Sequence, residues 1–233
     1  MKRFYEDVAV VENDACFAVT LDGRAMRTPG KVPLDLPSRK LAEAIACEWR
    51  AQGDKIDPHA MPLTRFANTA TDRVAALRDA VAGEIAGCAR TDLLCHRVAT
   101  PEDLAARQDA LWQPILDWAA ERHGATLLVT RDIVAVAQPE PALSALRAAV
   151  DAHGDFALSA LHSLTATCGS VVLALAVSSG RISACQAAEA SLLEEAYQAE
   201  QWGDDPEAVE RRDGIRAEIA SAARFLDCLT TQH

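Results

Sequence analysis

Thiols, imidazoles and paired carboxylates are the side chains of this sequence best suited to chemistry. Cys88, Cys95 and His96 come nearest to a metal-ligand cluster. A zinc or redox site needs closely spaced ligands, as in CxxC or HExxH, and neither pattern occurs in the chain. Because free cysteine is among the residues most often buried, we interpret Cys88 and Cys95 as core thiols and expect no metal site.

Paired carboxylates occur at Glu194-Glu195 and at Asp204-Asp205. Neighbouring helical residues point about 100° apart, so Glu194 and Glu195 do not face each other as an acid–base couple. Asp204 and Asp205 precede Pro206, which is typical of a helix start, where carboxylates accept hydrogen bonds from free N–H groups. Neither pair predicts a catalytic site.

Three common catalytic and cofactor motifs are missing from the sequence. A phosphate-cradling loop needs glycines followed by lysine, a dinucleotide site needs GxGxxG after a strand, and a nucleophile elbow needs GxSxG. We therefore expect no catalytic residue, no cofactor and no enzyme. An unrecognised small-molecule enzyme stays an alternative, because active sites are often assembled from distant residues around a deep polar pocket.

One constellation favours binding. In the stretch SLLEEAYQAEQWG, Glu195, Gln198 and Trp202 are spaced to share one face of a helix, with Glu194 beside them. A solvated polar face whose tryptophan closes the end of a helix bundle would have the same pattern. Tryptophan is enriched among interface hot spots and a carboxylate adds specificity, so we predict a partner-binding site at these four residues.

The elements that would position these residues begin with a hairpin. Phe17, Val19 and Leu21 alternate as in a half-buried strand, and the following Asp22-Gly23 is a favoured two-residue turn. We expect residues 4–11 to form another strand of the same antiparallel sheet.

A rigid elbow follows over residues 48–73. Ser38 predicts the N-cap of a helix that continues to Gln52, and prolines then separate it from a second helix. We assign structural roles to six residues of the elbow and of later turns: Trp49, Met61, Pro62, Asn68, Asp92 and Gly203.

The remainder of the chain changes character near residue 138. Short strands are predicted at 92–97, 126–130 and 133–136, a helix from Thr100-Pro101 to Gly124, and only helices beyond Pro139. The fold class is therefore α+β, with an N-terminal lobe (1–138) of strands and helices and an all-α orthogonal helix bundle (139–233). The strands near 126–136 could pair with the N-terminal sheet.

Composition narrows the classes of function. The chain has 233 residues and a net charge of −11, which argues against a nucleic-acid footprint. Its longest apolar run, 171–177, is far below the roughly 20 residues that span a bilayer. The first residues lack the apolar region of a secretory signal, and seven cysteines without a repeated spacing indicate a reducing compartment. We expect a cytoplasmic protein without membrane insertion.

Seven segments in the same order carry a resemblance to a known family. The chain resembles the assembly chaperones of the F-type ATP synthase α subunit, the "ATP-twelve" family, along nearly its whole length. The matching segments are RFYEDV, LDGRAMRTP, LAEAIACEWRAQ, MPLTRFANTATDR, TDLLCHR, WQPILDW and LLEEAYQAEQWG.

The resemblance implies a transient partner. Such proteins bind the new α subunit without nucleotide, shield a surface that is later buried against the β subunit, and are displaced by β. Large exposed apolar patches aggregate, so this surface needs cover. Glu195, Gln198 and Trp202 would then be the core of the α-subunit site. A stable structural subunit of a larger complex is a further alternative, which differs by remaining in the finished assembly.

Overall fold

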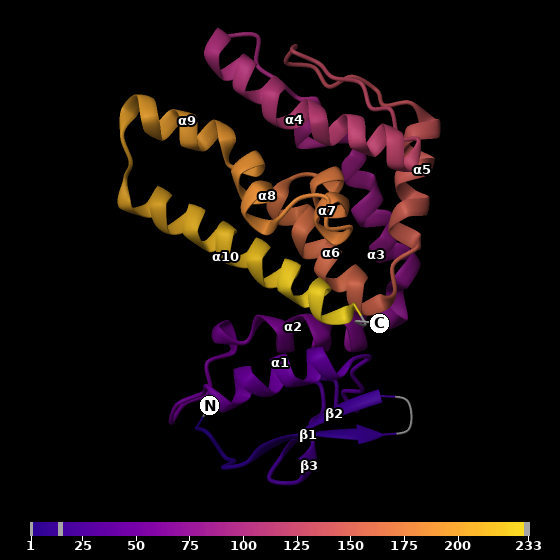
Figure 1. The fold of residues 1–233 in the computed structure, drawn as a ribbon, viewed down its shortest axis with the longest axis vertical. Coiled ribbons are helices and arrows are strands. Elements are labelled where there is room, and N and C mark those ends of the chain that lie inside the picture. The colour runs from indigo at the N-terminus through magenta and orange to yellow at the C-terminus, as the bar shows by residue number, and fades with distance from the viewer. Residues whose placement is uncertain (1, 14–15, 231–233) are drawn as a thin grey trace. The chain divides into compact units, whose positions relative to one another are not determined.

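The structure, a computed structural model, describes residues 2–13 and 16–230, and the chain forms two compact units. The first unit contains the chain up to Arg78, residues Gly154–Ala160 and the chain from Arg224 onward. The second unit contains Asp79–His153 and Leu161–Ala223. Figure 1 labels the helices and strands of both units.

A three-stranded antiparallel sheet opens the first unit. Its strands, in the order β1-β2-β3, are β1 (Val8–Asn13), β2 (Cys16–Leu21) and β3 (Arg24–Ala25). Asp22 and Gly23 connect β2 to β3 with φ values of +48° and +77°. Such positive values at both central positions are what a tight hairpin turn requires, which confirms the predicted turn. The first strand begins at Val8, later than predicted.

Helix α1 (Arg39–Arg50) lies against this sheet (Figure 1). The hydroxyl of Ser38 accepts a hydrogen bond from the Leu41 N–H at 3.1 Å, which confirms Ser38 as the N-cap. Leu41 and Ile45 are fully buried on the same face of the helix. Burial of this apolar face is what holds α1 on the sheet.

The elbow consists of a 3-10 turn (Pro58–Ala60), α2 (Pro62–Thr69), a π-helical turn (Ala70–Val74) and α3 (Ala75–Gly87). The buried Glu48 carboxylate, on α1, accepts hydrogen bonds from the Leu63 N–H, the Thr64 N–H and the Thr64 hydroxyl at 2.7–2.8 Å. Burial raises the pKa of Glu48. The first N–H groups of a helix lack intrahelical partners, so Glu48 caps α2 and fixes the elbow.

The second unit is helical around a buried central helix. Its elements are two 3-10 turns (Cys88–Thr91 and Leu93–Cys95), α4 (Glu102–His123), α5 (Glu140–Asp151), α6 (Asp155–Cys168), α7 (Val171–Ser178), α8 (Ala184–Ser191), α9 (Leu193–Trp202) and α10 (Pro206–Leu229). Helices α6 and α10 also contribute residues to the first unit. Helix α7 contacts α4, α5 and α8, and every residue from Val171 to Val177 is buried. The longest apolar run is therefore a core helix. No helix within residues 2–13 and 16–230 is long and apolar enough to cross a membrane.

Three predicted strands are wrong. Residues 92–97 contain a 3-10 turn. Residues 126–130 and 133–136 form no strand, because Thr130 makes only a single bridge with His96 and residues 132–134 are a bend. Strand pairing needs a neighbouring edge, and in the described part of the chain β1, β2 and β3 form the one sheet. Helix α4 begins at Glu102, one residue later than predicted, because Pro101 is extended and takes the N-cap position.

The α+β class is confirmed by an N-terminal antiparallel sheet followed by helices. The division at residue 138 stays a prediction, because the two units group residues by compactness and not by their ability to fold independently.

Candidate functional site

Helix α9 carries the four residues predicted to bind a partner. Glu194 and Glu195 stand in its first turn, where negative charge is favourable beside the helix dipole. Gly203 ends the helix with φ of +87°, a conformation that side chains with a Cβ rarely adopt. Tyr197 is the buried residue of α9. The exposed residues of α9, Gln198 and Glu200 to Trp202, all lie in its C-terminal half.

Hydrogen bonds attach α9 to α4. The Tyr197 hydroxyl donates to Asp103 Oδ1 at 2.9 Å, and the buried Gln108 donates from Nε2 to Glu194 Oε1 at 2.7 Å. Burial, with the bond to Asp103, raises the pKa of the Tyr197 hydroxyl, so it remains a protonated donor near neutral pH. Glu194 is therefore an anchor between helices rather than a free carboxylate.

Glu195 points instead toward α10. The two terminal nitrogens of Arg211 contact its two carboxylate oxygens, one of them at 2.9 Å. The hydrogen bonds to Glu195 raise the pKa of Arg211. Glu194 and Glu195 thus have different partners on different helices, as expected for side chains that do not face each other.

Trp202 and Gln198 complete the predicted face and are exposed. Trp202, at the last position of α9, leaves 79 % of its surface open. The tryptophan therefore does not close the end of the bundle, and this alternative from the sequence is wrong. The structure brings Glu195, Gln198 and Trp202 to one helix, but it leaves only Gln198 and Trp202 without a described side-chain partner.

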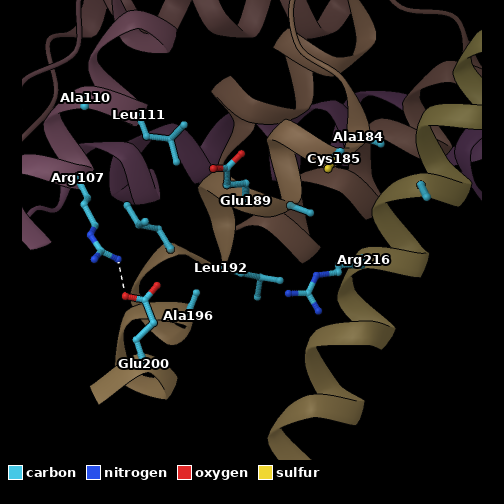
Figure 2. Close-up of a pocket in the computed structure, with 13 residues that line it drawn as sticks. Arg107, Ala110, Leu111, Ala184, Cys185, Glu189, Leu192, Ala196, Glu200 and Arg216 are labelled. Carbon is cyan, nitrogen blue, oxygen red and sulfur yellow. Dashed lines mark hydrogen bonds and ion pairs between the residues drawn. The ribbon is translucent and has the colours of Figure 1, made fainter. Parts of the chain in front are cut away.

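An apolar groove of about 870 Å³ lies on the other side of α9, between α4, α8 and α10 (Figure 2). Leu111, Leu192 and Ala196 are among its apolar lining residues. An ion pair between Arg107 and Glu200, with Nη1 2.7 Å from Oε2, stands at one rim. The sequence analysis did not predict the groove, because its lining combines α4 with the later helices α8, α9 and α10.

The groove is not built like a catalytic pocket. Charged side chains such as Glu189 and Arg216 line it, yet the pKa of Arg107 is the one shifted among its lining residues, raised by the bond to Glu200. Perturbed groups that converge on a pocket would indicate an active site. Within the described residues, no group of histidine, cysteine and carboxylate side chains is placed to hold a metal ion.

The thiols considered as metal ligands lie in different surroundings. Cys95 is fully buried, as interpreted from the sequence, and burial raises its pKa to about 12. Cys88 is only half-buried, in a neighbouring 3-10 turn. A thiol with so high a pKa is a poor nucleophile and a poor ligand, so Cys95 is part of the core.

The residues given structural roles at the elbow contact their neighbours as follows. Trp49 is half-buried, and its ring centroid lies 5.5 Å from that of Tyr5, whose hydroxyl donates to the Trp49 carbonyl at 2.7 Å. Met61 is buried just before Pro62, which occupies the first turn of α2, and Asn68 is half-buried near the end of α2. Their structural roles stay predictions.

Asp92 connects two helical turns of the second unit. Its fully buried carboxylate accepts hydrogen bonds from the Leu94 N–H at 3.1 Å and the Val172 N–H at 3.2 Å. Burial raises the pKa of Asp92 to about 6. The carboxylate therefore caps both the 3-10 turn that replaces the predicted strand and the central helix α7.

An exposed tryptophan on one side of α9 and an apolar groove on its other side, on an α+β scaffold, are typical of a protein that binds other proteins. The model of the ATP12 chaperone protein family matches residues 2–120. The chain is also similar to the crystal structure of Atp12 from Paracoccus denitrificans, with 43 % identity over 98 % of each chain and a TM-score of 0.93. A mutant of the same Atp12p superposes with a TM-score of 0.94, again at 43 % identity over 98 % of each chain.

A mitochondrial relative extends the comparison. The protein atp12 of Schizosaccharomyces pombe is 23 % identical, over all of this chain and 84 % of that protein. The chain belongs to the ATP12 chaperone family. It is therefore an assembly chaperone connected with ATP synthase, and not an enzyme.

Proposed function

We propose that this chaperone holds the unassembled α subunit of an F-type ATP synthase and covers the surface that α later buries against β. The β subunit then displaces it. The observation that carries the proposal is Trp202, which is 79 % exposed at the end of α9, the helix whose other side lines an apolar groove. A large exposed aromatic on a rigid helix is the type of residue that dominates binding energy at interfaces.

The groove supplies the second contact. Its apolar lining from Leu111, Leu192 and Ala196 suits apolar side chains, and the charged residues at its edge suit a polar rim. The ion pair of Arg107 with Glu200 already neutralises one side of the groove. An apolar surface of an unassembled subunit fits this arrangement better than a polar small molecule does.

Release limits the affinity. A holder that β displaces should bind no tighter than about 1 nM, or roughly −12 kcal/mol, while about 1 µM still protects a folding intermediate. An interface of about 800 Å² per partner is sufficient. No nucleotide motif occurs in the sequence, so the cycle of holding and release runs without ATP, in the compartment where α is made, which we place in the cytoplasm.

Gel filtration of the purified chain mixed with α subunit tests the proposal. The expected result is a complex that forms without nucleotide and separates when β is added. Co-elution with α that persists in the finished α/β assembly would instead identify a stable structural subunit. Failure of the two proteins to co-elute at 10-fold above about 1 µM would refute the proposed partner.

A further inference from the structure

The exposed segment of residues 131–137 between α4 and α5, which is apolar from Ile133 onward, has no role in the site described so far. Ile133 is fully exposed, at 103 %, and Val134 is 78 % exposed. Ala135 and Ala137 are also exposed, and Val136 is half-buried. In Figure 1 the chain between α4 and α5 runs out and back as two extended arms.

The arms are joined by specific hydrogen bonds. The buried Gln138 side chain accepts from the Leu128 N–H at 2.8 Å and donates to the Leu128 carbonyl at 2.9 Å. Thr130 pairs through its backbone with the Cys95 carbonyl at 2.8 Å and the Arg97 N–H at 2.9 Å. These contacts order the arms without burying the residues between them.

Ion pairs of Asp109 with Arg131 and Arg97 fix the start of the segment. Arg131 donates to the Val98 carbonyl at 2.8 Å and to Asp109 Oδ2 at 2.6 Å. Asp109 also accepts from the buried Arg97 at 2.7 Å, and the hydrogen bonds from both arginines hold its pKa below the usual range. The charge of Arg131 is therefore paired. These bonds fix the N-terminal end of the segment, while residues 133–135 remain exposed to solvent.

After these ion pairs, the backbone of residues 133–137 is available for pairing. In the part of the chain that the structure describes, no backbone group of residues 133–137 takes part in a hydrogen bond. Their sequence, IVAVA, is uncharged and rich in β-branched side chains, which favour strands. Unpaired backbone groups on such a segment are a ready template for another strand.

We propose that residues 131–137 bind an exposed edge strand of the client by adding a strand to it. This proposal rests on the proposed function, since the client is the unassembled α subunit. Main-chain hydrogen bonds from residues 133–137 would supply affinity, and Ile133 and Val134 would contact apolar side chains beside the client's edge strand. The client segment is therefore extended and apolar, not an amphipathic helix.

Charge argues against a membrane as the occupant. Anionic lipid surfaces attract clusters of lysine and arginine, whereas this segment has Asp132 at its start and its one basic residue, Arg131, is paired. The net charge of −11 also disfavours binding to an anionic lipid surface. Pairing between two copies of this chain is a separate outcome, which the experiment distinguishes.

Backbone amide hydrogen exchange of the full chain, with and without α subunit, tests the proposal. Amides of residues 133–137 should exchange quickly in the free chain and at least about tenfold more slowly with α, as new backbone bonds form. Protection near Trp202 without protection at 133–137 would overturn this inference and leave the proposed function standing. If adding α slowed amide exchange nowhere in the chain, both this inference and the proposed function would be overturned.

Variants separate backbone from side-chain contributions. Ala135→Pro removes one N–H that has no partner in the free chain, and Ile133→Thr/Val134→Thr removes apolar contact while keeping β-branching. Each should weaken the Kd for α by about tenfold or more, whereas Val32→Thr, at a residue 44 % exposed in the first unit, should change it less than twofold. An unchanged Kd for both test variants contradicts the proposal.

Two controls exclude the other occupants. Vesicles of phosphatidylcholine with phosphatidylserine should leave exchange at residues 133–137 unchanged, and so should raising the concentration of the chain alone. Protection by vesicles would mean a membrane site, and protection by the chain itself would mean self-pairing. Either result would overturn the assignment of the segment to the client.

Discussion

Replacing Trp202 with alanine should separate binding from folding. With 79 % of its surface exposed, the side chain buries only the remaining fifth. For a tryptophan this is about 50 Å², worth about 1.3 kcal/mol at roughly 25 cal/mol per Å². The free energy of unfolding should therefore fall by no more than about 1.3 kcal/mol. As a hot spot at the client interface, the same side chain should contribute about 2 kcal/mol or more to binding.

The binding loss converts to about a 30-fold rise in the Kd for the α subunit. Titration calorimetry with purified α measures it, and urea unfolding measures stability in the same preparations. Trp112→Ala is the opposite control: Trp112 is fully buried, and its Nε1 donates to the Ala190 carbonyl at 3.0 Å. That variant should lose about 3–5 kcal/mol of stability.

Phe4→Ala gives the matched surface control, because Phe4 is 61 % exposed and lies outside the second unit. It should change neither the Kd nor the stability by much. A folded Trp202→Ala protein whose Kd stays within about threefold of wild type would refute the hot-spot reasoning. The client would then bind elsewhere on the chain.

Three further predictions concern charged side chains. Glu48→Ala should lower the free energy of unfolding by about 3 kcal/mol in urea titrations, because two buried N–H groups of α2 lose their acceptor. A fall of less than about 1 kcal/mol would contradict the capping role of Glu48. The pKa of Asp92 is raised from 3.8 to about 6, so its charged form is disfavoured in the folded state. As pH rises from about 4 to about 6, the free energy of unfolding of the wild type should therefore fall by up to about 3 kcal/mol relative to that of Asp92→Asn. Free energies of unfolding that change in parallel with pH in the two proteins would refute this. Glu195→Lys should cost less than about 1 kcal/mol of stability, since the pair with Arg211 is exposed. The exchanged pair Glu195→Lys/Arg211→Glu should recover stability but not α binding, and recovery of both would make Glu195 purely structural.

Local signals in the sequence predicted the elements whose causes are local. The Asp22-Gly23 turn, the Ser38 cap and the glycine at the end of α9 each need only their own neighbours, and each is where it was expected. Trp202 was placed correctly on α9, but its exposure could not be derived from spacing, because a tryptophan that closes a bundle has the same position in the pattern.

Contacts between distant residues account for what the sequence did not predict. Glu48 caps a helix that begins at Pro62, well after its own helix has ended, and nothing in its own helix indicates this. The ion pair between Glu195 and Arg211 joins two helices, and the groove needs four. Residues 133–136 have the composition of a strand but no neighbouring edge, so β propensity alone predicted a strand that the chain does not form.

Light scattering of freshly diluted α subunit tests the central claim most directly. One equivalent of this chaperone, without ATP, should suppress aggregation, and adding β subunit should release α into an α/β assembly. Trp202→Ala at the same concentration should protect much less than Phe4→Ala. Aggregation that proceeds equally with and without the wild-type chain would contradict the proposed role.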